Sequence, residues 1–290
     1  MIYTIQNDTL KVEINSRGGE IWSIVKDGTE YLWQGDAKYW GDRAFNLFPY
    51  IARLTDGKYT LDGQTYNMTI HGFVNYTELT VESQTADSIV LGLKENAETL
   101  EKYPYQFGFK VAYTLAGDKL EVKFAVKNND DKTMYFGVGG HPGFNVPLEE
   151  GLGFEDYYLQ FDTDAEPVRI GFTKTCFLNG DDQPFALAEG SCIPMAHNMF
   201  DDDAIVLTGM SKGITLKSDK GTKSVHVEYP TMDYLGIWHM PFTDAPYVCI
   251  EPWTSLPSRQ DVVEDLATQP SLLSLPAGEE YENVWTIQIQ

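Results

Sequence analysis

Alternation of apolar and polar residues with a period of two runs through most of this chain. It is clearest in Leu10–Ile14, Phe109–Thr114 and Leu120–Val126. Because successive side chains of a β-strand point to opposite faces, this pattern predicts strands with one buried face. Further strands are predicted at Glu20–Val25, Leu79–Ser83, Ser88–Leu93, Ile214–Lys217, Ser224–Tyr229, Leu235–Trp238 and Asn283–Ile289.

Turn signals separate these segments at short intervals. Asp62-Gly63, between Lys58–Leu61 and Gln64–Tyr66, predicts a β-hairpin. Only two short helices are expected, at Ala97–Lys102 and Asp261–Leu266.

Many strands and few helices predict an all-β fold, either a large antiparallel β-sandwich or a barrel. The apolar fraction of 42% and the aromatic fraction of 13% suffice for a sizeable core. We expect a single domain over residues 1–290, because no Pro/Ser-rich linker occurs. A division near residue 150, where Leu148–Gly153 resembles a loop, is the alternative.

Charge and cysteine content narrow the classes of partner and compartment. The formal net charge of −22 argues against binding to nucleic acid or to an anionic membrane surface, since both require a basic face. No segment approaches the ~18 apolar residues of a membrane span, and the first residues lack the features of a signal peptide. The three cysteines, Cys176, Cys192 and Cys249, are odd in number and widely spaced. A cytoplasmic protein with reduced thiols is therefore expected, with Cys249 as a small core residue.

Two polar residues, 110 positions apart, are the main candidates for chemistry. His141 lies in the glycine-rich segment Gly137–Pro147, and Glu251 follows the apolar run Tyr247–Ile250. A proline directly follows each of them and restricts its backbone to extended geometry, so both are expected where a strand gives way to a turn. An imidazole and a carboxylate on rigid strand ends could act as an acid and a base. Glycine neighbours of His141 would also allow a ligand to approach the backbone closely.

Other polar residues are weaker candidates. His71 ends a short strand before Gly72, and Arg53 is the only cation of Ala44–Arg53, where a structural ion pair is the alternative role. His197, His226 and His239 carry less signal; His226 has the pattern of an outward residue on an edge or half-buried strand.

Motifs for other kinds of chemistry are missing. No two histidines stand at metal-ligand spacing, and neither a CxxC nor an HExxH motif occurs. A phosphate-binding glycine loop and a GxSxG elbow are also absent. No metal and no cofactor are therefore expected.

In the segments that contain the candidate residues, the chain resembles the aldose 1-epimerase (galactose mutarotase) superfamily, and within it the LacX-like branch. The resemblance covers essentially the whole chain. It rests, in family order, on Asn46–Pro49 running into Arg53, His71–Phe73, Gly140–Asn145, Cys249–Trp253 and Leu275–Glu279.

The resemblance implies a β-supersandwich with a sugar site in an open cleft and no redox cofactor. Glu251 would be the catalytic base and His141 the acid, with Arg53 and His71 contacting the substrate. The family also uses an aspartate, which matches Asp203, with Asp201 as the alternative in register. Two positions depart from the family pattern: Gly143 stands where classical mutarotases have a tyrosine, which would widen the cleft, and the glycine usual before Arg53 is missing.

The expected reaction interconverts the α and β anomers of an aldohexose, the small-molecule partner. Glu251 would take the proton of the C1 hydroxyl and His141 would protonate the ring oxygen, each held in its charged form by its neighbour. One alternative is an isomerase for a hexose 6-phosphate, for which Arg43 could supply a second cation. The other is a carbohydrate-binding protein without catalytic activity. Trp238 or Phe73 could pack on a sugar face.

Overall fold

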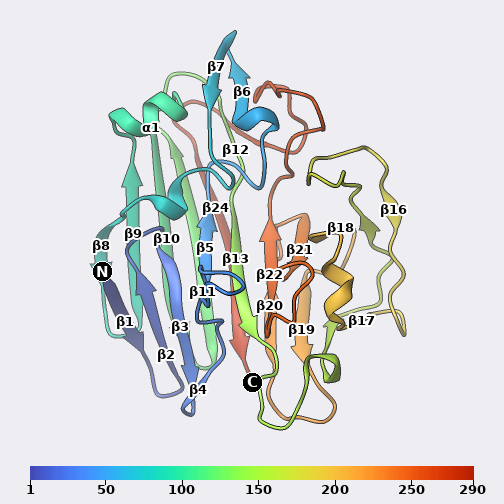
Figure 1. Ribbon diagram of the computed structural model, residues 1–290. Helices are drawn as coiled ribbons and strands as arrows, with labels where there is room; N and C mark the ends of the chain where they lie inside the picture. The colour runs from blue at the N-terminus through green and yellow to red at the C-terminus, as the bar shows by residue number, and fades with distance from the viewer.

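The computed structural model describes residues 1–290, and antiparallel sheets dominate it (Figure 1). The seven-stranded sheet has the order β16 (Gln183–Pro184), β15 (Val168–Arg169), β18 (Ile205–Thr208), β21 (Tyr234–Trp238), β22 (Tyr247–Trp253), β13 (Gly139–Asn145) and β5 (Ala44–Leu47). The nine-stranded sheet has the order β17 (Cys192–Pro194), β14 (Tyr158–Phe161), β19 (Gly213–Lys217), β20 (Val225–Glu228), β24 (Glu280–Ile289), β11 (Lys119–Asn128), β10 (Phe107–Ala116), β9 (Ser88–Lys94) and β8 (Thr80–Gln84). The all-β sandwich predicted from the alternation is thereby confirmed.

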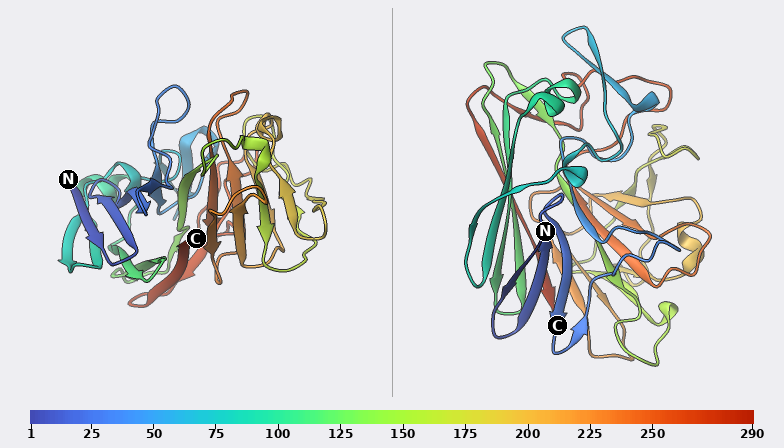
Figure 2. Two further views of the ribbon diagram at one scale, coloured as in Figure 1. Left: turned by 90° about the horizontal axis from the view of Figure 1, so that it is seen from below. Right: turned by 60° about the vertical axis from the view of Figure 1, so that its left-hand side comes forward.

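Smaller elements complete the fold. A four-stranded sheet contains β1 (Ile2–Gln6), β2 (Leu10–Asn15), β3 (Glu20–Lys26) and β4 (Thr29–Glu30), and two strand pairs join β6 (Lys58–Leu61) to β7 (Gln64–Asn67) and β12 (Met134–Phe136) to β23 (Leu273–Leu275). The helices are α1 (Ala97–Lys102) and the 3₁₀ turns η1 (Thr55–Gly57), η2 (Val74–Tyr76), η3 (Phe154–Asp156) and η4 (His197–Phe200). None of them has the length and apolar character that a bilayer crossing requires. Seen from below, the N-terminal strands lie at one end of the molecule and the segment around β16 and β17 at the other (Figure 2).

Local sequence signals account for most of the small elements. The hairpin β6–β7 turns at Asp62-Gly63 as predicted. Helix α1 is confirmed, and its first turn is capped by Asn96, whose Oδ1 accepts the Thr99 N–H at 3.0 Å.

The prediction of a helix at Asp261–Leu266 is wrong, because this segment is not helical. Its backbone groups bond to the β6–β7 hairpin instead: the Glu264 carbonyl accepts the Thr60 N–H at 2.7 Å, and the Leu266 N–H donates to the Thr60 carbonyl at 3.0 Å. Tertiary hydrogen bonds thus replace the helical ones in a segment too short to be helical on its own.

Both large sheets contribute to a hydrophobic cluster of 63 buried residues. Alternate residues of β22, Val248 and Ile250, belong to this core, so Cys249, Glu251 and Trp253 point to the other face of the sheet. The contact between the sheets is close: a Cβ atom on Gly140 of β13 would lie 2.5 Å from the ring of Trp285 on β24. The period-two pattern therefore decides which side chains of the seven-stranded sheet remain available for a site.

Gly72 packs against the backbone of Phe48, which directly follows β5, and so holds the segment that carries His71 beside the sheet. Its φ is +77°, and a Cβ atom there would lie 2.2 Å from the carbonyl oxygen of Phe48, which also accepts the N–H groups of Phe73 and Val74. Such a backbone contact leaves no room for a side chain.

We expect Gly72→Ala to destabilise the protein by at least ~3 kcal/mol, because strain at positive φ adds to a clash with backbone that cannot move. Gly63→Ala is the matched control: its φ is +75° and its Cβ would meet nothing within 4 Å, so it should cost only about 1 kcal/mol. Urea unfolding of both variants measures the difference, and equal losses would contradict the steric argument.

Candidate functional site

His141 and Glu251 lie directly opposite each other on neighbouring central strands. The pairing of Gly139 with Trp253 and of Gly143 with Cys249 puts His141 of β13 across from Glu251 of β22. Their side chains are 8% and 2% exposed, and His141 Nε2 lies 3.2 Å from Glu251 Oε2. The prediction that both residues lie at strand ends is wrong. Both lie inside strands, although Pro142 and Pro252 each remove a hydrogen-bond donor from the sheet.

The glycines before His141 serve packing rather than ligand approach, contrary to expectation. A Cβ atom on Gly139 would lie 2.7 Å from the carbonyl of Pro252, and Gly140 is covered by Trp285. Neither glycine belongs to the wall of the cavity that His141 and Glu251 line.

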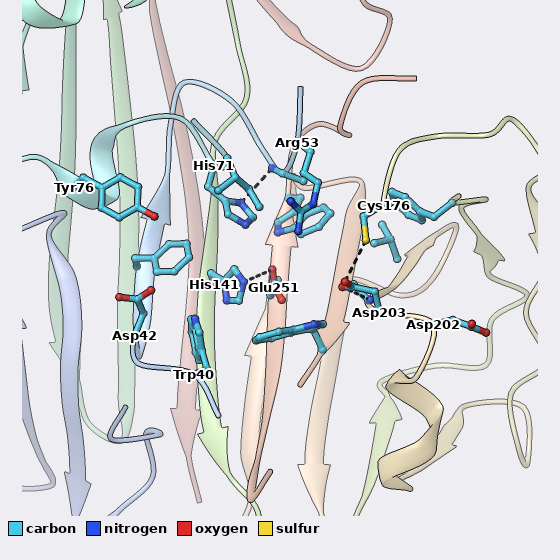
Figure 3. A pocket seen from close by; sticks show the side chains of 18 residues that line it. Trp40, Asp42, Arg53, His71, Tyr76, His141, Cys176, Asp202, Asp203 and Glu251 are labelled. Carbon is cyan, nitrogen blue, oxygen red and sulfur yellow. Dashed lines mark hydrogen bonds and ion pairs between the residues drawn. The ribbon is translucent and has the colours of Figure 1, made fainter. Parts of the chain in front are cut away.

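One cavity of about 260 Å³ brings together all five candidate residues of the sequence analysis (Figure 3). Its wall consists of Trp40, Asp42, Phe45, Ala52, Arg53, Ile70, His71, Tyr76, His141, Phe172, Cys176, Asp202, Asp203, Ala204, Val206, Trp238, Glu251 and Trp253. These residues come from β5, β13, β18, β21 and β22 of the seven-stranded sheet, from η2 and from the loops that cover the sheet. Glu251 and His141 lie at the base of the cavity, with Arg53, His71 and Asp203 around them (Figure 3).

His71 presents a hydrogen-bond donor to this cavity. Its Nδ1 accepts the Ala52 N–H at 3.1 Å, so the proton of the neutral ring lies on Nε2. Burial and the nearby guanidinium of Arg53 lower the pKa of His71 to about 3. The ring of His71 stands edge-on to that of His141, with the centroids 5.4 Å apart.

Arg53 and Asp203 provide opposite charges on the wall beside Cys176. Cys176 Sγ donates to Asp203 Oδ2 at 3.1 Å, and burial together with this carboxylate raises the pKa of the thiol to about 11. Arg53 takes part in no ion pair of the protein, so the alternative role as a structural ion-pair partner has no support. Asp201, the alternative to Asp203, lies outside the cavity wall.

Burial controls the protonation of the central pair. It raises the pKa of Glu251 well above its usual range, aided by the charge of Asp203, and lowers the pKa of His141 well below its usual range, aided by His71. Burial thus opposes the expected charges, a carboxylate and an imidazolium, and favours a carboxylic acid beside a neutral imidazole. The acid–imidazole pair and the carboxylate–imidazolium pair contain the same number of protons, and they differ only in which group binds one of them. His141 Nδ1, on the other side of the ring from the contact with Glu251, has no hydrogen-bond partner.

Several wall residues gave no usable signal in the sequence. Trp40 and Phe45 lie against His141, with ring centroids 4.9 and 4.7 Å away. Trp40 also fills the space beside Gly143, where a Cβ would lie 3.0 Å from its ring, so this glycine does not widen the cleft as expected. Trp238 lines the cavity.

The other candidates lie elsewhere. Phe73 is 4% exposed in the core, and His197, His226 and His239 are outside the cavity wall. His226 lies in β20 between β19 and β24, so of the two expected settings the edge strand is wrong and the half-buried strand is confirmed: His226 is half-exposed between the buried Val225 and Val227. Cys249 is buried as expected, and all three cysteines are free.

One group of side chains could hold a metal ion. Atoms of His141, Cys249 and Glu251 lie within 4.8 Å of one another, and such nitrogen, sulfur and oxygen ligands suit Zn²⁺. Two of the three are the central pair of the cavity, so metal binding would compete with proton transfer by that pair.

Comparison with known proteins confirms the resemblance found in the sequence. The family model for aldose 1-epimerase matches residues 1–288. Protein LacX from Lactococcus lactis subsp. lactis is 34% identical over 281 residues, which are 94% of each chain. Among solved structures, a galactose mutarotase related enzyme from Lactobacillus acidophilus is 35% identical with a TM-score of 0.95, covering 100% of this chain and 97% of that one. A galactose mutarotase-like protein from Lactobacillus casei is 31% identical with a TM-score of 0.95, covering 100% of both chains.

The lowered pKa of His71 predicts a loss of stability in mild acid. Below pH 6.5 the unfolded chain binds a proton at His71 that the folded chain refuses until about pH 3, so the free energy of unfolding falls as the pH falls through this interval. We expect His71→Asn to reduce the stability difference between pH 7.5 and pH 5 by roughly 1 kcal/mol, allowing for partial exposure of the ring.

Asparagine suits this substitution, because it tolerates the φ of 64° at position 71 and its Oδ1 can accept the Ala52 N–H. Urea unfolding at the two pH values measures the effect. An identical pH dependence in the variant and the wild-type protein would contradict the neutral state assigned to His71.

Proposed function

Because the chain belongs to the aldose 1-epimerase family, we propose that it interconverts the α and β anomers of an unphosphorylated aldohexose. The observation that carries this proposal is the pair His141 and Glu251. It joins an acid and a base at 3.2 Å at the base of the cavity, and Nδ1 of His141 has no hydrogen-bond partner in the protein. A buried polar atom without a partner is costly, so a bound ligand is a natural source of the missing hydrogen bond.

The reaction requires two proton transfers. The C1 hydroxyl loses a proton while the ring oxygen gains one, and the C1–O5 bond breaks to give the open-chain aldehyde. After rotation about the C1–C2 bond, the same transfers run in reverse and the ring closes on either face. Glu251 takes the first proton and His141 gives the second, each transfer being worth typically ~10²–10⁴-fold in rate.

These roles are available because the pair holds one proton more than a carboxylate beside a neutral imidazole, and either group can bind that proton. Burial stores this proton on Glu251 in the absence of a ligand. Its passage to His141 across the 3.2 Å contact produces the carboxylate that accepts from C1 and the imidazolium that donates to the ring oxygen. Glu251 returns its proton on closure and His141 recovers the one it gave, so both groups are reset. Ring opening forms no bond between the sugar and the protein, so the reaction needs no covalent intermediate.

The surrounding residues fit the hydroxyl groups of a sugar. His71 offers Nε2–H, and Arg53 offers donors that no carboxylate of the protein engages. Asp203 can accept hydrogen bonds, and the rings of Trp40 and Trp238 provide apolar surface against the sugar ring. We assign these residues to substrate positioning.

Charge favours a neutral sugar over a sugar phosphate. Arg53 is the only Lys or Arg of the cavity wall, which also contains four carboxyl groups. Arg43, the candidate second cation, stacks on Trp22 at 3.8 Å and donates to the Trp22 carbonyl instead. A phosphate site built on one cation among carboxyl groups would be weak.

A carbohydrate-binding protein without catalytic activity requires less of its site than an isomerase does. A binding protein needs donors, acceptors and aromatic surface, but it does not need an acid facing a base. The close approach of two buried titratable groups therefore supports catalysis.

Glu251→Gln should lower the enzyme-catalysed rate of mutarotation of glucose or galactose by at least ~10²-fold, because the amide cannot accept the C1 proton. Polarimetry from the pure α anomer measures the rate. Glu121→Gln, on the exposed face of β11, is the matched control and should retain the wild-type rate.

A folded Glu251→Gln protein with wild-type activity would exclude Glu251 as the base. If the wild-type protein is stabilised against heat by the sugar but does not accelerate mutarotation, the carbohydrate-binding alternative holds instead.

Glucose and glucose 6-phosphate separate the two isomerase readings. We expect kcat/KM for the free sugar to exceed that for the phosphate by about tenfold or more, since the phosphate meets uncompensated carboxyl groups. Parallel polarimetric assays of the two sugars check this, and a preference for the phosphate would overturn the assignment of a neutral substrate.

A further inference from the structure

A second hollow adjoins the cavity on the side of Asp202 and Asp203. We define it as the Phe242 groove; it is bounded by segment 169–174, residues 179, 181 and 183, segment 201–203, and Pro241 and Phe242. Phe172, Asp202 and Asp203 belong to the walls of both, so the two spaces adjoin each other. The groove has a volume of about 600 Å³, more than twice that of the cavity. In Figure 3, Asp203 lies near Glu251, and Asp202 lies farther from Glu251 and His141.

Phe242 contributes little to the stability of the fold where it stands. It lies in the loop between β21 and β22, its side chain is 80% exposed, and it buries almost nothing against the core. Its φ is 57°, a left-handed conformation that is unfavourable for a bulky residue. Glycine or asparagine would suit this position better on stability grounds, so an exposed ring in this conformation points to a role in binding.

The loop that carries Phe242 is held in place. The Phe242 N–H donates to Asp201 Oδ1 at 3.3 Å, and the Met240 N–H donates to the hydroxyl of Tyr247 at 3.1 Å. Opposite, Asn179 Nδ2 donates to the Phe172 carbonyl at 3.1 Å. The ring therefore lines a preformed groove rather than swinging on a free loop.

The polar groups of the groove fit hydroxyl groups better than an anion. Four aspartates, at 181, 201, 202 and 203, face two cations, Arg169 and Lys174. This excess of carboxylates disfavours a phosphate or a carboxylate ligand. Neutral donors and acceptors such as Asn179 and Gln183 complete the wall.

We propose that the Phe242 groove binds the second sugar unit of a neutral reducing oligosaccharide, whose reducing end occupies the cavity at Glu251 and His141. The anomeric carbon would lie at the base of the cavity, and the glycosidic bond would pass Asp203 and Asp202. The next sugar ring would pack on Phe242, with its hydroxyl groups bonded to the polar wall. This assignment rests on the proposed function and names its substrate class.

The test uses disaccharides that share one reducing unit. Maltose, cellobiose and lactose all end in glucose, so the ratio of kcat/KM for each disaccharide to that for glucose isolates the contribution of the second unit. We expect at least one of them to be preferred over glucose by about tenfold in the wild-type protein. No preference for any of the three would overturn the proposal.

Two variants assign that preference to the ring. Phe242→Gly removes the ring at a φ that glycine adopts freely, so the protein should be no less stable and the preference should fall toward unity. Phe242→Tyr keeps an aromatic ring and should keep the preference. If Phe242→Gly leaves the ratio unchanged, or changes the oligomeric state in gel filtration instead, the ring serves another contact and the proposal fails.

Failure of the groove and failure of the proposed activity can be told apart. Methyl glycosides of the same disaccharides cannot undergo mutarotation, so their binding by isothermal titration calorimetry does not depend on catalysis. Binding that is weakened about tenfold by Phe242→Gly would support the groove even if no sugar is turned over. Mutarotation of glucose without binding of any disaccharide glycoside would leave the proposed function intact and refute the groove.

Discussion

The close packing of the seven-stranded sheet against the nine-stranded sheet is the constraint on which the rest of the structure depends. It takes one face of β13, β21 and β22 into the core, where Trp285 touches Gly140. Because side chains alternate along a strand, Glu251 must then point to the opposite face. Antiparallel register adds His141 at the same level on the neighbouring strand. The site is thus a product of sheet geometry, and loops only complete its walls.

Several local rules of protein structure are broken together around this cavity. Pro142 and Pro252 lie in central strands, where proline removes ladder hydrogen bonds. Ala52, His71, Cys176 and Asp203 all line the cavity with positive φ values, although they are four of only ten non-glycine residues in that conformation. A buried acid and a buried base lie at its base, and His141 Nδ1 has no hydrogen-bond partner. Each feature costs stability, and together they mark the part of the molecule that was shaped by something other than folding.

The cavity and the Phe242 groove share this character but differ in chemistry. Aromatic rings surround the titratable pair in the cavity and create the burial that shifts its protonation. The groove is more polar, and its exposed phenylalanine is the apolar exception. A small cavity lined mainly by apolar residues next to a wider, more polar groove suits a substrate of which one sugar unit reacts while its neighbour is only held.

The sequence by itself determined the strand content, the sandwich class, the family and the identity of the central pair. These follow from patterns that are local, such as the alternation in β10 and β11, or from motifs such as those around His141 and Glu251. Only the tertiary structure decided that the two groups face each other, that Arg43 is engaged by Trp22, and that segment 261–266 bonds to a hairpin instead of forming a helix. It also buries the pair, which raises the pKa of Glu251 and lowers that of His141. Register between strands over a hundred residues apart and the depth of burial depend on the whole fold, so no local pattern specifies them.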